Sequence, residues 1–258
     1  MRMMWYWLFL LSIWSTTPAC NDNGENPAPA DTENRYKIEG TIANAAGRQI
    51  KLQVLPIARP GQQQQTVILD TATLSPAGQF SMEGTIEHPI IGVLTLDNQH
   101  AAYILIDAAQ YRFDADYNNW NDYQLSGHPG SLVLTNFLNN LSQQVMSIRN
   151  LQQQTQQARK TKDAAAIAAA QQAEYDGLDR YYHYLATFAD TTTVATVALY
   201  AGDIMDINID REKVEALVNK YRDTHAGSPY WQRLVHKLES GGHPLIGETA
   251  PEIRLPNP

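Results

Sequence analysis

The chain contains one cysteine among its 258 residues. A lone thiol can form no disulfide within the chain, and it supplies no Cys-x-x-Cys pair for dithiol redox chemistry. The sequence therefore excludes a chain that carries out thiol–disulfide exchange with its own residues. We predict a non-catalytic protein.

Basic residues are also scarce. Lys and Arg number 19 against 27 Asp and Glu, which gives a net charge of −8. Binding to nucleic acid requires a basic patch or stripe, and the sequence has neither, so we expect no nucleic-acid partner. The same charge provides no attraction to anionic lipid headgroups. Contact with a membrane would need another cause.

Motifs for catalysis and metal binding are missing as well. The seven His residues show neither His-x-x-x-His nor His-Glu-x-x-His spacing, and no Gly-x-Ser-x-Gly occurs. Asp114-x-Asp116-x-Asn118 begins like a calcium loop, but Asn119 and Leu125 stand where that loop needs Gly and Glu. We predict no catalytic residue, no metal site and no cofactor.

The N-terminus has the pattern of an export signal. Met3–Trp14 is an apolar run of twelve residues, broken only by Ser12 and preceded by Arg2. It is shorter than the roughly 20 residues of a spanning helix and suits the core of a signal peptide. We therefore expect residues 1–19 to be a signal peptide.

Cys20 follows this signal directly and resembles the cysteine of a bacterial lipoprotein, which becomes the acylated N-terminus after cleavage. The resemblance implies lipid attachment at Cys20 and a chain anchored in the cell envelope, facing the periplasm or on the outer membrane. Thr17 stands where such signals usually have Leu. Thr17 and Ala19 also suit the general signal peptidase, so ordinary secretion is the alternative. Residues 20–34 are polar and Pro-rich, which predicts a flexible tether.

Residues 35–127 are predicted to form an antiparallel β-sandwich. Short alternating apolar runs are separated by turn residues, and no helical period interrupts them. The clearest unit is 67–86, where two such runs flank a break with Pro and Gly and predict a β-hairpin. Phe80 and Met82 fall on one face of its second strand.

Residues 131–242 are predicted to be α-helical, which makes the fold class α+β. Ser131 is a candidate N-cap for a first helix, and the polar stretch 152–162 follows it. An Ala-rich second helix begins near Asp163, and the two should form an antiparallel hairpin. The apolar stripe of the first helix has four-three spacing and comprises Leu134, Leu138, Leu141, Val145 and Ile148. Three shorter helices are expected to begin near Thr191, Asp210 and Ser228.

Five segments of the β region together resemble domain of unknown function 4369. They are Tyr36-Lys-Ile-Glu-Gly40, Leu69-Asp-Thr-Ala72, Gly78-Gln-Phe-Ser-Met-Glu-Gly84, Tyr103-Ile-Leu-Ile106 and Leu125-Ser-Gly127. The resemblance implies an N-terminal domain of an envelope lipoprotein, followed by a helical region and then by a thioredoxin-like domain of the thiol–disulfide interchange or peroxiredoxin type. Residues 245–258, with Gly247-Glu-Thr-Ala-Pro251, are similar to the start of that last domain.

Two functional hypotheses follow. The first is a lipid-anchored envelope module that precedes and positions a thioredoxin-like oxidoreductase domain, with that domain or an envelope redox protein as partner. The alternative is a free-standing binding or scaffolding lipoprotein that recognises an envelope partner or a glycan.

One aromatic cluster is a candidate binding surface. Tyr117, Trp120 and Tyr123 stand among Asn and Asp residues, where their rings could stack on a sugar or a peptide. The structural alternative is that these rings cover one edge of the sandwich core.

Overall fold

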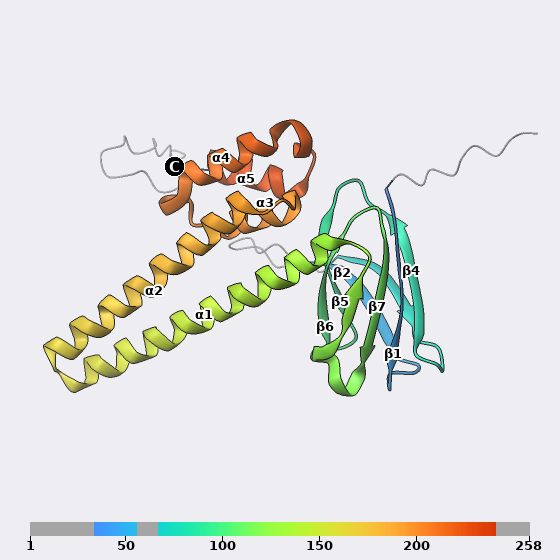
Figure 1. Cartoon of the computed structure of the whole chain (residues 1–258), viewed down its shortest axis with the longest axis horizontal. Coiled ribbons are helices and arrows are strands. Elements are labelled where there is room, and N and C mark those ends of the chain that lie inside the picture. Colours follow the sequence, from blue (N-terminus) through green and yellow to red (C-terminus); the bar gives the residue numbers. More distant parts are fainter. Residues whose placement is uncertain (1–33, 56–66, 241–258) are drawn as a thin grey trace, which may run out of the picture. The chain divides into compact units, whose positions relative to one another are not determined.

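Figure 1 shows the computed structural model of the chain, which describes residues 34–55 and 67–240. The predicted signal peptide, Cys20, the tether before residue 34 and the segment 245–258 lie outside the described residues. Within the described ranges, no helix has the length and apolar character needed to cross a membrane.

The β region forms two four-stranded sheets, as the sequence predicts. The sheet that contains the first strand has the order β4 (Gln79–Thr85), β1 (Arg35–Ala43), β7 (Gln110–Asp116), β8 (Gln124–Ser126). The second sheet has the order β3 (Ile68–Thr73), β2 (Gln49–Val54), β5 (Ile90–Thr95), β6 (Ala101–Ile106).

A hydrophobic core lies between the two sheets. Every second residue of β1 is buried, as expected for a strand with one face on a core. Ile38 and Phe113 from one sheet share this core with Leu52 and Ile104 from the other, and all four are fully buried. The region is therefore a β-sandwich, and the predicted face of β4 is confirmed by the burial of its apolar residues.

The predicted hairpin at 67–86 is wrong in its pairing. β3 pairs with β2 and β4 pairs with β1, so the two strands belong to opposite sheets. The turn itself forms, with Gly78 at φ 75° and its N–H donating to the Ser75 carbonyl. Leu74 exchanges hydrogen bonds with Gly47 and Arg48, directly before β2, while the Gly78 carbonyl accepts from the Ile42 N–H of β1. The chain thus crosses between the sheets at a turn that looks like a hairpin turn in sequence.

A second difference concerns strand direction. β1 and β7 run parallel, with Ile38 opposite Tyr111 and Gly40 opposite Phe113, whereas the other pairings are antiparallel. An alternating pattern shows which face of a strand is buried but not which way its neighbour runs. The antiparallel prediction therefore fails for this one pair.

The helical region follows the β-sandwich. Its elements are α1 (Pro129–Thr161), α2 (Ala164–Thr191), α3 (Ala195–Ile204), α4 (Ile207–His225) and α5 (Pro229–Glu239). α1 and α2 lie side by side as an antiparallel hairpin (Figure 1), as predicted. The predicted start of α5 after Ser228 is also confirmed.

The first helix begins earlier and ends later than the sequence predicts. His128 is its N-cap, and Ser131 lies inside its first turn. The stretch 152–162 continues the helix to Thr161, because Gln, Arg and Lys are good helix formers on an exposed surface. Lys162 ends it in the left-handed conformation. The second helix begins near Asp163 as predicted, and Asp163 is its N-cap.

The start of α4 also differs. Asp206 is the N-cap and accepts a hydrogen bond from the Asn208 N–H. Asp210 lies one turn further on at a kink (φ −116°), where its buried carboxylate bonds Lys213. Ile209 precedes Asp210 and is 55% exposed, so it does not form a hydrophobic staple with Val214 at this position. Two Asx residues four positions apart both fit a cap, and the sequence alone does not choose between them.

Candidate functional site

The aromatic cluster lies on a short 3₁₀ helix, η1 (Tyr117–Asp122), between β7 and β8. Trp120 is only 7% exposed, its ring packs against Phe113, and its indole N–H donates to the Ala101 carbonyl. Tyr123 packs against the same Phe113. The Trp120 ring therefore covers the sandwich core, as in the structural alternative.

Two side chains lie close to the Tyr117 ring. The Arg48 guanidinium lies 4.1 Å from its ring centroid, and the His100 ring centroid lies 4.4 Å away. Its hydroxyl donates to Asp97, and His100 bonds the same carboxylate at 2.7 Å. Trp120 is buried, and the Tyr117 ring contacts Arg48 and His100. The binding surface predicted at Tyr117, Trp120 and Tyr123 stays a prediction.

Asp97 organises the turn beside this cluster. Hydrogen bonds from the Gln99 N–H and from His100 lower the pKa of Asp97 to about 2. A carboxylate that is ionised and fully engaged in this way holds the β5–β6 turn in place. This turn supports Tyr117 and Trp120, so the role of Asp97 is structural.

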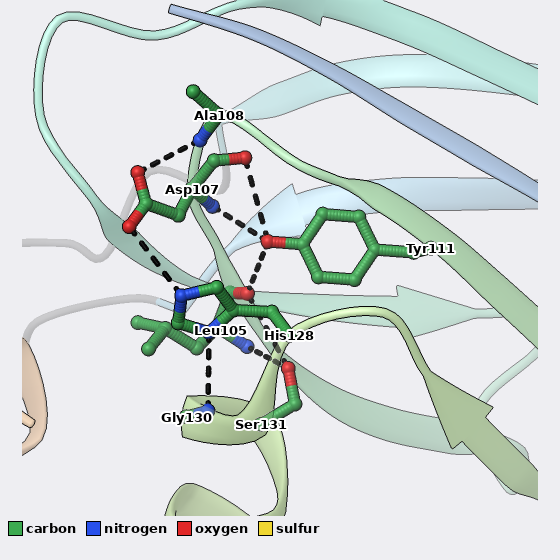
Figure 2. Close-up of polar contacts among 7 residues, drawn as sticks. All are labelled: Leu105, Asp107, Ala108, Tyr111, His128, Gly130 and Ser131. Atoms are coloured by element: carbon green, nitrogen blue, oxygen red, sulfur yellow. Dashed lines mark hydrogen bonds and ion pairs between the residues drawn. The ribbon is translucent and has the colours of Figure 1, made fainter.

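A hydrogen-bonded group of residues joins the β-sandwich to α1, and Figure 2 shows it. The junction, as we call it, consists of Leu105, Asp107, Tyr111, His128 and Ser131. Leu105 lies on β6, an edge strand, and the junction supplies partners for its outward-facing backbone groups. Only two residues separate the end of β8 from the start of α1, so the junction has no long linker.

Two hydroxyls satisfy Leu105. Ser131 Oγ, 3% exposed as a residue, accepts from the Leu105 N–H at 3.2 Å and lies 3.4 Å from its carbonyl oxygen. Tyr111 Oη donates to the same carbonyl at 2.8 Å and accepts from the Asp107 N–H at 2.7 Å. The first turn of the helix thus takes the place of a further strand along β6.

His128 fixes the start of the helix. Its Nδ1 accepts from the Gly130 N–H at 3.1 Å, so the ring proton is on Nε2, which lies 3.5 Å from Asp107 Oδ2. Ser, His and Asp therefore meet here, but not as a catalytic triad. Nδ1 is used for capping, and the Ser131 hydroxyl bonds the Leu105 backbone rather than His128.

A second contact attaches the end of the helical region to the same sheet. Tyr230, on α5, is 1% exposed, and its hydroxyl accepts from the Ile91 N–H at 3.0 Å. Ile91 on β5 is the direct partner of Leu105 on β6. Both residues also belong to the hydrophobic core formed by the helices. The first and last helices therefore hold the same pair of sheet residues.

Sequence reasoning missed the junction and Tyr230. One signal for the junction was available, because Pro129 follows His128 just as Pro229 follows Ser228, and Pro favours the first helical position. The hydrogen bond between Ile91 and Tyr230 joins residues 139 positions apart, so no local sequence pattern predicts it. Across residues 34–55 and 67–240, no group of three His, Cys, Asp or Glu side chains is placed to hold a metal ion.

Replacing Tyr111 by Phe tests the junction. The change leaves the Leu105 carbonyl and the Asp107 N–H without this partner, and we expect the free energy of unfolding to fall by about 1–3 kcal/mol. Urea denaturation gives the value. Tyr175, 67% exposed, is the matched control, and Tyr175→Phe should change stability by less than about 0.5 kcal/mol. Equal effects of the two substitutions would contradict the assigned role.

Buried tyrosines also predict an alkaline transition. Burial raises the pKa of Tyr111, Tyr200 and Tyr230 to about 12. Because these values exceed the ordinary tyrosine pKa of about 10, the unfolded state releases the protons first. Stability should be complete below about pH 10 and should decline as the pH rises towards 12. Absorbance titration of phenolate, with circular dichroism in parallel, should show a late class of tyrosines that ionises together with unfolding; ionisation of all tyrosines near pH 10 in the folded chain would contradict it.

Residues 36–131 match the family model described as domain of unknown function (DUF4369). The match confirms the domain family predicted from the β motifs, and it extends from β1 into the first turn of α1, so that Ser131 is included. No curated protein and no solved structure matches the chain.

Proposed function

We propose that the chain is a lipid-anchored envelope module that precedes and positions a thioredoxin-like thiol–disulfide oxidoreductase domain, without chemistry of its own. The observation that carries the proposal is the attachment of the helices to the β-sandwich. Ser131 and Tyr230 fix the first and last helices to partnered residues of β5 and β6. A spacer joined in this way passes the orientation of the sandwich on to whatever follows it.

The rest of the proposal is supported by the order of features along the chain. An export signal ends at the lone Cys20, a domain of the matched family follows, and a segment similar to the start of a thioredoxin-like domain stands after the helices. The single thiol is used for the proposed lipid anchor, so the chain keeps none for redox chemistry. We therefore assign the redox chemistry to the proposed thioredoxin-like domain.

The gene sequence beyond the codon for Pro258 is the most direct test. A continuation that encodes a Cys-x-x-Cys motif within a thioredoxin-like domain is the expected result. A stop codon, or a continuation without this motif, would contradict the proposal and favour a free-standing binding lipoprotein.

The anchor is tested separately by labelling cells with radioactive palmitate. The wild-type chain should carry label and sediment with membranes, because two or more acyl chains give stable anchoring. Cys20→Ser should lose the label, whereas the control Thr32→Ala in the predicted tether should keep it. An unlabelled wild-type chain released from cells would indicate ordinary secretion.

A further inference from the structure

A pocket of about 430 Å³ lies between α2 and α4, next to the end of α3. Its volume is within the range of sites that hold small organic molecules. It takes no part in the junction, and the proposed positioning function does not use it. From its lining, we propose that it binds a small organic carboxylate with an apolar body.

The floor of the pocket is apolar. Ala186, Met205 and Leu217 line it, and all three are buried. Ala216 lines the α4 wall and is exposed. Short alanine side chains on both helices leave between them the space that larger residues would fill, and this space suits a hydrocarbon chain or ring.

The α4 wall carries two lysines, Lys213 and Lys220. Seven residues of helix separate them by roughly 10 Å along the axis. Lys213 Nζ bonds Asp210 Oδ1 at 2.6 Å, and Lys220 Nζ bonds the main-chain carbonyl of Asp190 at 2.8 Å. Each ammonium group has three N–H donors, so both retain donors for a ligand.

Of the two lysines, Lys220 is the one better placed to hold a ligand carboxylate. Asp210 neutralises Lys213 as an ion pair, whereas Lys220 bonds a neutral carbonyl. Asp190, Thr187 and His183 line the α2 wall. The Asp190 carboxylate would repel a ligand carboxylate, so the ligand's headgroup must lie on the α4 side of the pocket, towards Lys220. A carboxylate would accept hydrogen bonds from Lys220, and its apolar body would lie on the floor.

Octanoate is the probe for this proposal, and octanol and octylamine are its matched controls with the same hydrocarbon chain. Thermal unfolding of the full chain is followed at several ligand concentrations. Octanoate at ten times its Kd should raise Tm by about 3–5 °C, because a ligand that binds only the folded state stabilises it. Octanol and octylamine should give smaller shifts. Equal shifts from all three probes would overturn the proposal.

Variants locate the effect. Ala216→Leu fills the space from an exposed position and should remove the octanoate shift while the Tm without ligand stays close to that of the wild-type chain. Lys220→Met should also remove the shift, and Lys220→Arg should restore it. Lys160→Met, outside the pocket on α1, should leave the shift unchanged. An octanoate shift that survives both Ala216→Leu and Lys220→Met would show that the pocket is not the site.

Discussion

Replacing Gly40 by Ala should cost about 4 kcal/mol or more of the free energy of unfolding, a large part of the stability of an ordinary domain. Gly40 lies in the middle of β1, between Phe80 on β4 and Phe113 on β7. A Cβ atom there would lie 1.8 Å from the Phe113 carbonyl oxygen and 3.0 Å from the Phe80 ring. The nearest obstacle is backbone, so β1 and β7 would have to separate, and the hydrogen bonds between them would be lost.

Gly47→Ala is the matched control. Gly47 has a positive φ of 75°, but nothing lies within 4 Å of a Cβ atom placed there. This substitution should cost only the strain of the left-handed conformation, on the order of 1–2 kcal/mol. Chemical denaturation of both variants, or the amount of chain that survives proteolysis, measures the difference. A Gly40→Ala chain as stable as Gly47→Ala would show that β1 and β7 do not pair as described.

The second large effect is expected at Tyr230. Tyr230→Ala removes a buried ring that packs against Tyr200, and it leaves the Ile91 N–H without its acceptor. Loss of a buried aromatic ring costs about 3–5 kcal/mol. Tyr230→Phe keeps the ring and loses only the hydroxyl, so its cost should be about 1–3 kcal/mol.

The residues that lose protection from hydrogen exchange distinguish the Tyr230–Ile91 contact from ordinary core packing. Hydrogen exchange of Tyr230→Ala should show faster exchange at Ile91 on β5 and in α5, with the strands of the β1 sheet much less affected. Urea denaturation supplies the two energies. If Tyr230→Phe cost as much as Tyr230→Ala, the ring would carry none of the stability and the described packing would be wrong.

The sequence predicts the parts of this fold that depend on local patterns. Alternation in 35–127 predicts the strands and their buried faces, and the Pro at the start of α5 predicts that helix. The predicted start of α2 near Asp163 is also correct, because the Asp163 side chain can cap the Ala-rich run that follows it. The starts of α2 and α5 depend on residues only a few positions away, so the sequence alone predicts them.

What the sequence does not predict depends on distant residues. The turn at Gly78 has the local sequence of a hairpin turn. Hydrogen bonds of Leu74 and Ile42 nevertheless hold the strands before and after it in different sheets. The Trp120 ring is buried because Phe113 and the Ala101 carbonyl receive it, and a polar neighbourhood in sequence hides this. Asp70 on β3 accepts from the Glu83 N–H of the other sheet. Each of these outcomes is decided by packing partners that local spacing does not specify.

The parallel pairing of β1 with β7 has a consequence for the timing of export. The hydrogen bond between Thr41 and Asp114 spans 73 residues, so the first strand has no partner on this side until more than seventy further residues have been made. Contacts of such large separation form slowly, since the intervening chain must first be brought together. If the chain is exported as we propose, this delay favours passage through the membrane in an unfolded state. The strand order would then keep the β-sandwich unfolded while the residues of β1 cross the membrane.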